Sequence, residues 1–194
     1  IIKAAQKAGI GLTHLPVFYM QGGLNGQSLT EGQLRFGNER DGFLQLLEQA
    51  QVALLKAPED YLLGIAPHSL RAVSQESLQE IVKAINYGPI HIHIAEQLKE
   101  VDDVLESYGA RPVEWLLQNV EVDSRWCLIH ATHMIPEEIQ NVAKSGAVVG
   151  LCPITEANLG DGVFDGSGFL SSGGKYGIGS DSNVFIALTE ELRL

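Results

Sequence analysis

The stretch I-H-I-H-I-A-E-Q at residues 90–97 shows the pattern on which much of the chain is built. Its isoleucines alternate with His91 and His93, and successive side chains of a strand point to opposite faces of a sheet. The two imidazoles therefore share one face, and Glu96 and Gln97 follow where the strand gives way to a loop. The pattern predicts a buried strand with chemically active side chains at its C-terminal end.

Apolar runs with the character of strands recur along the chain and are separated by amphipathic stretches. The predicted strands lie at about 11–18, 61–66, 90–95, 126–131, 147–151 and 176–179. One predicted helix ends at Gly9. The others lie at 41–57, 74–86, 111–119, 136–145 and, as a short segment, 166–173. This regular alternation of strand and helix predicts an α/β fold with a parallel sheet.

Polar side chains follow the C-terminal ends of successive predicted strands. They are Tyr19, the segment 67–71, Glu96 and Gln97, the segment 130–133, the segment 155–162, and Asp181. In a β/α barrel the loops after the strands form the active-site face, and the long irregular segment 20–38 directly follows a strand. The sequence therefore predicts a β/α barrel whose active site lies at this rim.

The composition excludes several classes of protein. The 194 residues are 45% hydrophobic and 19% charged, which predicts one globular domain or a large piece of one. The formal net charge of −11 disfavours nucleic acid and acidic membrane surfaces as partners. The sequence has no 18-residue apolar run, and Cys127 and Cys152 form no C-x-x-C motif. We expect a cytoplasmic protein with reduced, buried thiols.

Side chains from different strands are expected to meet at one mouth of the barrel. Gly177, Gly179 and Asp181 share a face of the last predicted strand, so that Asp181 would approach His93 and His130. Two imidazoles and a carboxylate suit zinc or a similar divalent ion. Glu96 lies three residues beyond His93 and could move a proton beside such an ion.

Other polar residues leave a structural and a functional interpretation open. His68 and Arg71 could pair or cap at the surface, although an arginine at a rim is also a natural clamp for a carboxylate. Glu156 and Asn158 are equally typical of turns. A structural role is the better interpretation for His14, His91 and His133.

Several motifs together resemble a known family. The segments H-I-H-I-A-E-Q at 91–97, C-L-I-H-A-T-H at 127–133 and G-I-G-S-D-S at 177–182 resemble strands five, six and eight of the amidohydrolase superfamily. Within this superfamily, four further segments resemble the formimidoylglutamate deiminases of histidine degradation. They lie at 11–19, 31–36, 67–73 and 152–162. The resemblance implies a (β/α)8 TIM-like barrel of the metal-dependent hydrolase type, incomplete here at about strands three to eight.

The resemblance also implies roles for particular residues. His93 resembles the zinc ligand of strand five, and Asp181 resembles the ligand of strand eight that also takes a proton from the attacking water. His130 resembles the strand-six histidine near that water and the reacting carbon. Glu96 resembles the acid/base that protonates the leaving nitrogen.

The implied substrate is a small dicarboxylate. Arg71, His68 and Tyr19 resemble the positions that bind its carboxylates. The implied reaction is the hydrolytic deamination of N-formimino-L-glutamate to N-formyl-L-glutamate and ammonia. The resemblance further implies one zinc ion per subunit, with iron(II) as another candidate metal, and a homodimer.

The chain also departs from the family pattern. The family's first strand carries an H-x-H that supplies two zinc ligands, whereas the H-x-H of this chain is His91-Ile-His93 on the expected strand five. We therefore expect residues 1–194 to be a single partial barrel domain, without that strand or the family's small β domain. Two ligands would hold zinc weakly, so the isolated chain is expected to be inactive. The alternatives are an aminohydrolase that acts on a purine-, pterin- or triazine-like ring, and a catalytically inactive chain that only binds a partner.

Overall fold

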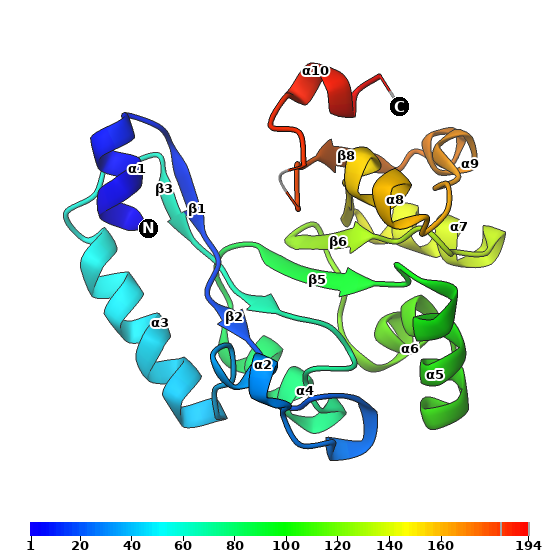
Figure 1. The fold of residues 1–194 in the computed structure, drawn as a ribbon, viewed down its shortest axis with the longest axis horizontal. Coiled ribbons are helices and arrows are strands. Elements are labelled where there is room, and N and C mark those ends of the chain that lie inside the picture. Colours follow the sequence, from blue (N-terminus) through cyan, green and yellow to red (C-terminus); the bar gives the residue numbers. More distant parts are fainter. Residues whose placement is uncertain (183, 194) are drawn as a thin grey trace. The chain divides into compact units, whose positions relative to one another are not determined.

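The structure is a computed structural model that describes residues 1–182 and 184–193. The chain divides into two compact units, Ile1–His91 and Ile92–Leu194, and each is described by itself (Figure 1). No helix among the described residues is long and apolar enough to cross a membrane.

The first unit contains short parallel strand pairs and surrounding helices. Its elements are α1 (Ile2–Ala8), β1 (Leu12–His14), β2 (Val17–Phe18), η1 (Leu24–Gly26), α2 (Glu31–Leu34), α3 (Arg40–Leu54), β3 (Tyr61–Leu63), β4 (Ala66–Pro67) and α4 (Gln75–Ala84). β1 pairs with β3, and β2 pairs with β4. The helix α3 buries Phe43, which stacks on Phe18 with ring centroids 4.9 Å apart.

The predicted strands 11–18 and 61–66 are each broken into two short strands. Pro16 has no N–H to donate, although its carbonyl accepts a hydrogen bond from the Ala66 N–H. Ile65 lies between β3 and β4, which pair with β1 and β2, but its own backbone pairs with the segment 89–91 instead. Its N–H donates to the carbonyl of Pro89, and its carbonyl accepts from the His91 N–H. The single-strand prediction was wrong because Ile65 pairs with the next strand along the chain.

Gly88 and Gly9 make a matched pair for testing the packing of the first unit. Both have φ of +68°, but an added Cβ would lie 1.9 Å from the Leu63 carbonyl oxygen at Gly88 and would meet nothing within 4 Å at Gly9. Gly9→Ala should therefore cost about 1 kcal/mol of stability from backbone strain alone. Gly88→Ala should cost roughly 3 kcal/mol more because the clash is with backbone. Urea unfolding of both variants measures the difference, and equal losses would contradict the packing described here.

The second unit is organised around a sheet with strand order β5-β6-β7-β8. Its first strand is β5 (Ile90–Ile94), of which Ile90 and His91 still belong to the first unit. The elements that follow are α5 (Leu98–Tyr108), α6 (Pro112–Asn119), β6 (Trp126–His130), α7 (Pro136–Ser145), β7 (Val148–Leu151), α8 (Pro153–Leu159), α9 (Gly166–Ser171), β8 (Lys175–Ile178) and α10 (Leu188–Glu191). β6 pairs with β7, and β7 with β8, in parallel. The three isoleucines of β5 are buried on one face, together with Trp126 and Leu128 of β6.

Three helices among the described residues of this unit, α5, α8 and the short α10, are absent from the sequence prediction. α5 buries Val101 and Val104, which are spaced as on an amphipathic helix, and ends at Gly109 with φ of +72°. α8 starts at Pro153 and ends at Gly160 with φ of +74°, an arrangement typical of helix ends.

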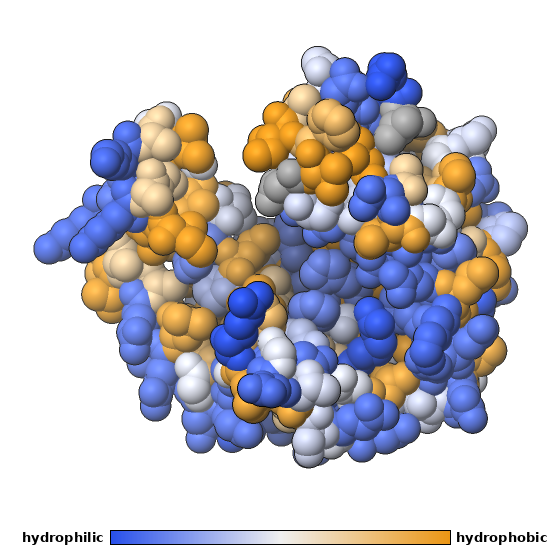
Figure 2. Space-filling model, in the orientation of Figure 1, coloured by the Kyte–Doolittle hydropathy of each residue, from blue (hydrophilic) through white to orange (hydrophobic). Residues whose placement is uncertain are grey.

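Exposed apolar side chains surround α10, and Figure 2 shows this surface at the C-terminal end of the unit. They are Val184, Phe185, Ile186, Leu188 and Leu192.

Burial keeps the two free cysteines protonated. Loss of hydration raises the pKa of Cys127 to about 11 and, with help from nearby carboxylates, that of Cys152 to about 12. Cys127 lies on β6 against Gly150 of β7, where an added Cβ would come within 3.0 Å of its sulfur.

The Cys127 thiol should make the stability of the protein depend on pH in the alkaline range. The unfolded chain releases this proton near pH 9, whereas the folded chain holds it to about pH 11. The stabilisation is therefore fully present below pH 9 and is lost as the pH rises to 11, by about 2–3 kcal/mol. Unfolding free energies of the parent and of Cys127→Ala from pH 7 to 11 test this. The variant should show a shallower fall, and parallel curves would contradict the prediction.

Candidate active site

The second unit brings His93 and His130 side by side. Their ring centroids are 5.7 Å apart and the rings are inclined by 28°. His91 and His93 lie on the half-exposed face of β5, opposite the buried isoleucines, so the predicted alternation of this strand is confirmed. The structure thus joins residues that lie 37 positions apart in the sequence, at the ends of neighbouring strands.

His130 ends β6 in a left-handed backbone conformation. Its φ is +68°, and that of Ala131 is +50°. Burial alternates along the strand, with Trp126, Leu128 and His130 as its buried residues. The left-handed turn falls at the residue that contacts His93. Such conformations cost roughly 1–3 kcal/mol and persist only where the surrounding structure holds them.

Carboxylates lie on both sides of the His130 imidazole. Its Nδ1 is 3.1 Å from Oε1 of Glu156, a hydrogen bond, and its Nε2 is 3.7 Å from Oε1 of Glu96, a longer charge contact. The His130 side chain is almost fully buried. Burial alone lowers the pKa of His130, but the hydrogen bond to Glu156 and the charges of Glu96, Glu156 and Asp181 outweigh it and raise the pKa.

Glu100 fixes the segment that carries Glu96. Its carboxylate, 1% exposed, accepts hydrogen bonds from the Ala95 N–H at 3.2 Å and from the Glu96 N–H at 3.1 Å. Ala95 has φ of +50°, so this bend at the end of β5 is held by a buried acceptor from α5. The sequence interpretation missed Glu100. A glutamate in the first turn of a helix is common, and its position in the sequence does not show which backbone N–H groups its carboxylate binds.

Asp181 follows β8 and is exposed, with φ of +37°. Its negative charge contributes to raising the pKa values of both His130 and Cys152. The adjacent Ser182 is held by Thr155 of α8, whose Oγ1 lies 2.8 Å from the Ser182 Oγ and accepts a hydrogen bond from the Ser182 N–H. Gly177 leaves open space on β8 beside this segment, as the sequence predicts.

Three buried residues of the second unit form a group of potential metal ligands. In the part of the chain that the structure describes, His130, Cys152 and Glu156 form the one group of three whose ligand atoms lie within 4.8 Å of one another. The predicted ligands His93 and Asp181 are not in that group. The wider set of imidazoles and carboxylates nevertheless has the donor chemistry that zinc takes.

The first unit brings Tyr19 and His68 together at the ends of β2 and β4. The two rings meet edge to face, with centroids 4.6 Å apart. The Tyr19 hydroxyl accepts a hydrogen bond from Nε2 of Gln33 at 2.9 Å, and Nδ1 of His68 lies 3.1 Å from the Ser69 Oγ. Gln33 belongs to α2, inside the long segment predicted to be irregular, and sequence reasoning did not select it.

Arg71 lies in the turn that follows β4. Its Nε is buried and has no hydrogen-bond partner among residues 1–182 and 184–193. The turn itself is held by Gln21, whose Nε2 donates to the Arg71 carbonyl at 3.3 Å. A buried guanidinium N–H without a protein acceptor is costly unless an external acceptor satisfies it, and a carboxylate does so with a charge-assisted hydrogen bond.

His133 has the structural role that the sequence favours. Its Nε2 lies 2.6 Å from the carbonyl oxygen of Asp161, and its N–H donates to the Ala95 carbonyl. Its own carbonyl accepts a hydrogen bond from Nη2 of Arg111. His133 therefore ties the loop after β6 to two neighbouring segments.

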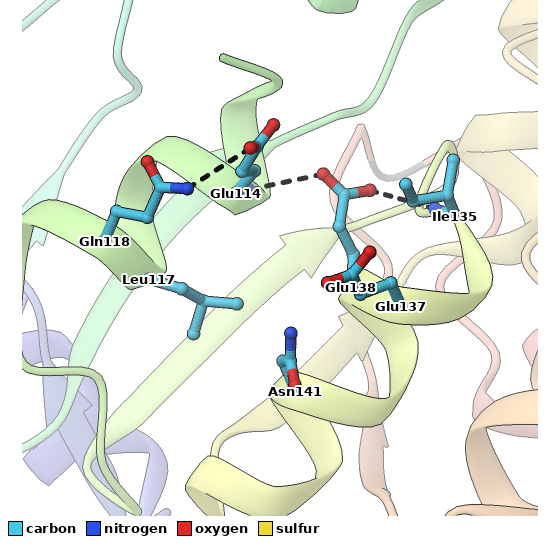
Figure 3. Close-up of a pocket in the computed structure, with 7 residues that line it drawn as sticks. All are labelled: Glu114, Leu117, Gln118, Ile135, Glu137, Glu138 and Asn141. Atoms are coloured by element: carbon cyan, nitrogen blue, oxygen red, sulfur yellow. Dashed lines mark hydrogen bonds between the residues drawn. The ribbon is translucent and has the colours of Figure 1, made fainter.

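A groove of about 440 Å³ between α6 and α7 contains none of the predicted site residues. Figure 3 shows its lining, and Glu138 lies at its centre. The Glu138 carboxylate, 3% exposed, accepts from the N–H groups of Glu114 and Ile135 and pairs with Nε of Arg111 at 3.3 Å. The buried acid of this groove thus connects the two helices.

Within each unit taken by itself, polar residues gather at the carboxyl ends of parallel strands that alternate with helices, the arrangement typical of the β/α-barrel class of protein. The model of the amidohydrolase family matches residues 21–194. The chain belongs to the amidohydrolase family. The predicted α/β fold class, a (β/α)8 barrel of the metal-dependent hydrolase type, is confirmed for the part of the barrel that the chain spans.

Individual relatives support this assignment. The chain is 52% identical over all its 194 residues to a formimidoylglutamate deiminase of Pseudomonas aeruginosa and spans 42% of that protein's length. A crystal structure of an amidohydrolase from Brucella melitensis matches the whole chain with a TM-score of 0.96 at 53% identity, and the chain covers 43% of it. An adenosine deaminase from Xanthomonas campestris, solved with bound zinc, shares the fold with a TM-score of 0.76 at 19% sequence identity. The match covers 92% of this chain and 38% of the deaminase chain. The predicted resemblance to formimidoylglutamate deiminases is confirmed.

The buried Glu138 should be far more important to stability than its neighbour Glu137. Glu138→Ala removes a buried partner of Arg111 and leaves two N–H groups without their acceptor, which should cost about 3–5 kcal/mol. Glu137→Ala, on the same helical turn but exposed, should change the unfolding free energy by less than about 0.5 kcal/mol. Denaturant unfolding of both variants measures this, and similar losses would contradict the structural role of Glu138.

Proposed function

We propose that the protein hydrolyses N-formimino-L-glutamate to N-formyl-L-glutamate and ammonia. In this reaction the oxygen of water adds to the formimino carbon, the bond from that carbon to its terminal nitrogen breaks, and the nitrogen leaves as ammonia with the water's protons. The chain spans less than half of the relatives it matches, so this proposal concerns the activity of the whole protein. The identity to a formimidoylglutamate deiminase along the full chain supports it.

The observation that carries the proposal is the buried Nε–H of Arg71, which has no hydrogen-bond partner within residues 1–182 and 184–193. We assign Arg71, with His68 and Tyr19 from the same unit, to the binding of the substrate's carboxylates. The protein has a formal net charge of −11, which repels a dianion at long range. A guanidinium whose Nε–H has no acceptor among the described residues offers the attraction that such a substrate requires.

We assign the chemical steps to residues of the second unit. His93 and Asp181 would help to hold a zinc ion, and iron(II) takes similar donors. When bound, such an ion acts as a Lewis acid that makes hydroxide available at neutral pH. Asp181 would accept a proton from the attacking water, Glu96 would protonate the leaving nitrogen, and His130 would hydrogen-bond near the reacting carbon. The homodimer and the cytoplasmic location stay predictions.

Arg71 separates this reaction from deamination of a purine-, pterin- or triazine-like ring. In the full-length protein, Arg71→Ala should raise the KM for N-formimino-L-glutamate by about 100-fold, because a charged hydrogen-bond partner contributes roughly 1.5–3 kcal/mol. The change in kcat should be smaller. Ammonia release is measured with N-formimino-L-glutamate and, separately, with adenosine, guanine and a triaminotriazine, each of which carries an amino substituent on its ring that deamination would release.

The matched control is Arg40→Ala, since Arg40 is an exposed arginine of the same unit paired with Glu80. It should leave kcat and KM unchanged. Ammonia release from a ring substrate but not from N-formimino-L-glutamate would overturn the proposed function. So would an Arg71→Ala variant with the KM of the parent.

A further inference from the structure

The first turn of α8 directs a buried carboxylate at the end of the neighbouring strand β6. The Glu156 side chain is 5% exposed, and its Oε1 accepts a hydrogen bond from Nδ1 of His130 at 3.1 Å and from the Cys152 N–H at 2.9 Å. The second bond anchors the accepting oxygen to the backbone where β7 ends. The position of the His130 ring is therefore tied to the rigid junction of β7 and α8.

We propose that Glu156 is a positioning residue that fixes the ring orientation of His130 and keeps the proton of its imidazole on Nδ1. The proposal rests on the proposed function, in which His130 hydrogen-bonds near the reacting carbon. It adds a residue that does not itself touch substrate and acts through His130.

The chemistry of the two groups determines which nitrogen carries the proton. A carboxylate only accepts hydrogen bonds, so Nδ1 must be the donor in the pair. Nε2 is then the atom presented on the opposite edge of the ring, toward Glu96 at 3.7 Å. An imidazole that rotated or changed tautomer would present the wrong atom there.

Glu156 also helps to stabilise the unusual backbone conformation of His130. With φ of +68°, this residue lies in a conformation that needs support from its surroundings. The hydrogen bond to Glu156 and the packing against His93 are two of the side-chain contacts that hold the ring. Loss of Glu156 should therefore allow the ring to leave its place beside His93.

The same atoms allow one competing interpretation. His130, Cys152 and Glu156 lie close enough to bind a metal ion together. An ion bound at Nδ1 would replace the proton there, so the protonation of Nδ1 in the zinc-loaded protein distinguishes the two cases.

The tautomer of His130 can be measured without any turnover. We would record long-range ¹H–¹⁵N spectra of the zinc-loaded full-length protein labelled with ¹⁵N-histidine, and assign His130 from the signal lost in His130→Gln. The parent should show a proton on Nδ1 of His130, and Glu156→Gln should retain it because the amide oxygen still accepts. Glu156→Ala should lose this fixed tautomer. A parent protein with no proton on Nδ1, or a Glu156→Ala variant with the spectrum of the parent, would overturn the proposal.

Steady-state kinetics give the functional readout. Glu156→Ala should lower kcat for N-formimino-L-glutamate by about 10–100-fold, the usual effect of removing a partner that orients an active-site group, and should change KM by less than about threefold. Glu156→Gln should recover most of the loss. Glu137→Ala, an exposed acid of the same unit, should have the kcat of the parent.

The outcomes separate the two proposals. A parent that is inactive on N-formimino-L-glutamate, but whose Nδ1 proton depends on Glu156, overturns the proposed function and supports the positioning role. An active parent whose Glu156→Ala variant is folded and keeps the parent's kcat overturns the positioning role alone. If Glu156→Ala does not fold, Glu156→Gln decides: loss of both the Nδ1 proton and kcat in that variant overturns the proposal.

Discussion

Parallel hydrogen bonding between β6, β7 and β8 is the constraint on which the site of the second unit depends. The register places Ile129 beside Gly150 and Gly150 beside Gly177, so the three strands end at one edge of the sheet. Residues that follow these ends become neighbours although many positions separate them in the sequence. The contacts among His130, Glu156 and the segment after β8 all follow from this register.

Strained backbone accompanies the chemistry at this edge. Ala95, His130 and Asp181 all have positive φ values although none is glycine. Each such residue costs roughly 1–3 kcal/mol, which the surrounding contacts must offset. Glu100 and Glu156 supply such contacts as buried carboxylates that accept hydrogen bonds from backbone N–H groups. The arrangement exchanges stability for fixed positions of the side chains, which catalytic groups require.

The first unit provides a different kind of chemistry. Tyr19, His68 and the turn that carries Arg71 meet after short strands that are held by mutual pairing and by Gln21 and Gln33. These contacts fix the backbone and the rings but leave the Nε–H of Arg71 without an acceptor among the described residues. The unit therefore combines a rigid frame with a cationic N–H that the described residues leave without an acceptor, which is the kind of donor that the proposed carboxylate binding would use.

The sequence by itself determined the alternation of strand and helix, the shared face of His91 and His93, and the polar residues at the strand ends. These features are local, because the period of a strand and the residues after it can be read along the chain. Only the tertiary structure decided that Ile65 pairs with the next strand, that His130 turns toward His93, and that Glu100 and Glu156 are buried acceptors. Such roles depend on partners from other elements, because a carboxylate in a helix pattern looks the same whether it faces water or a histidine.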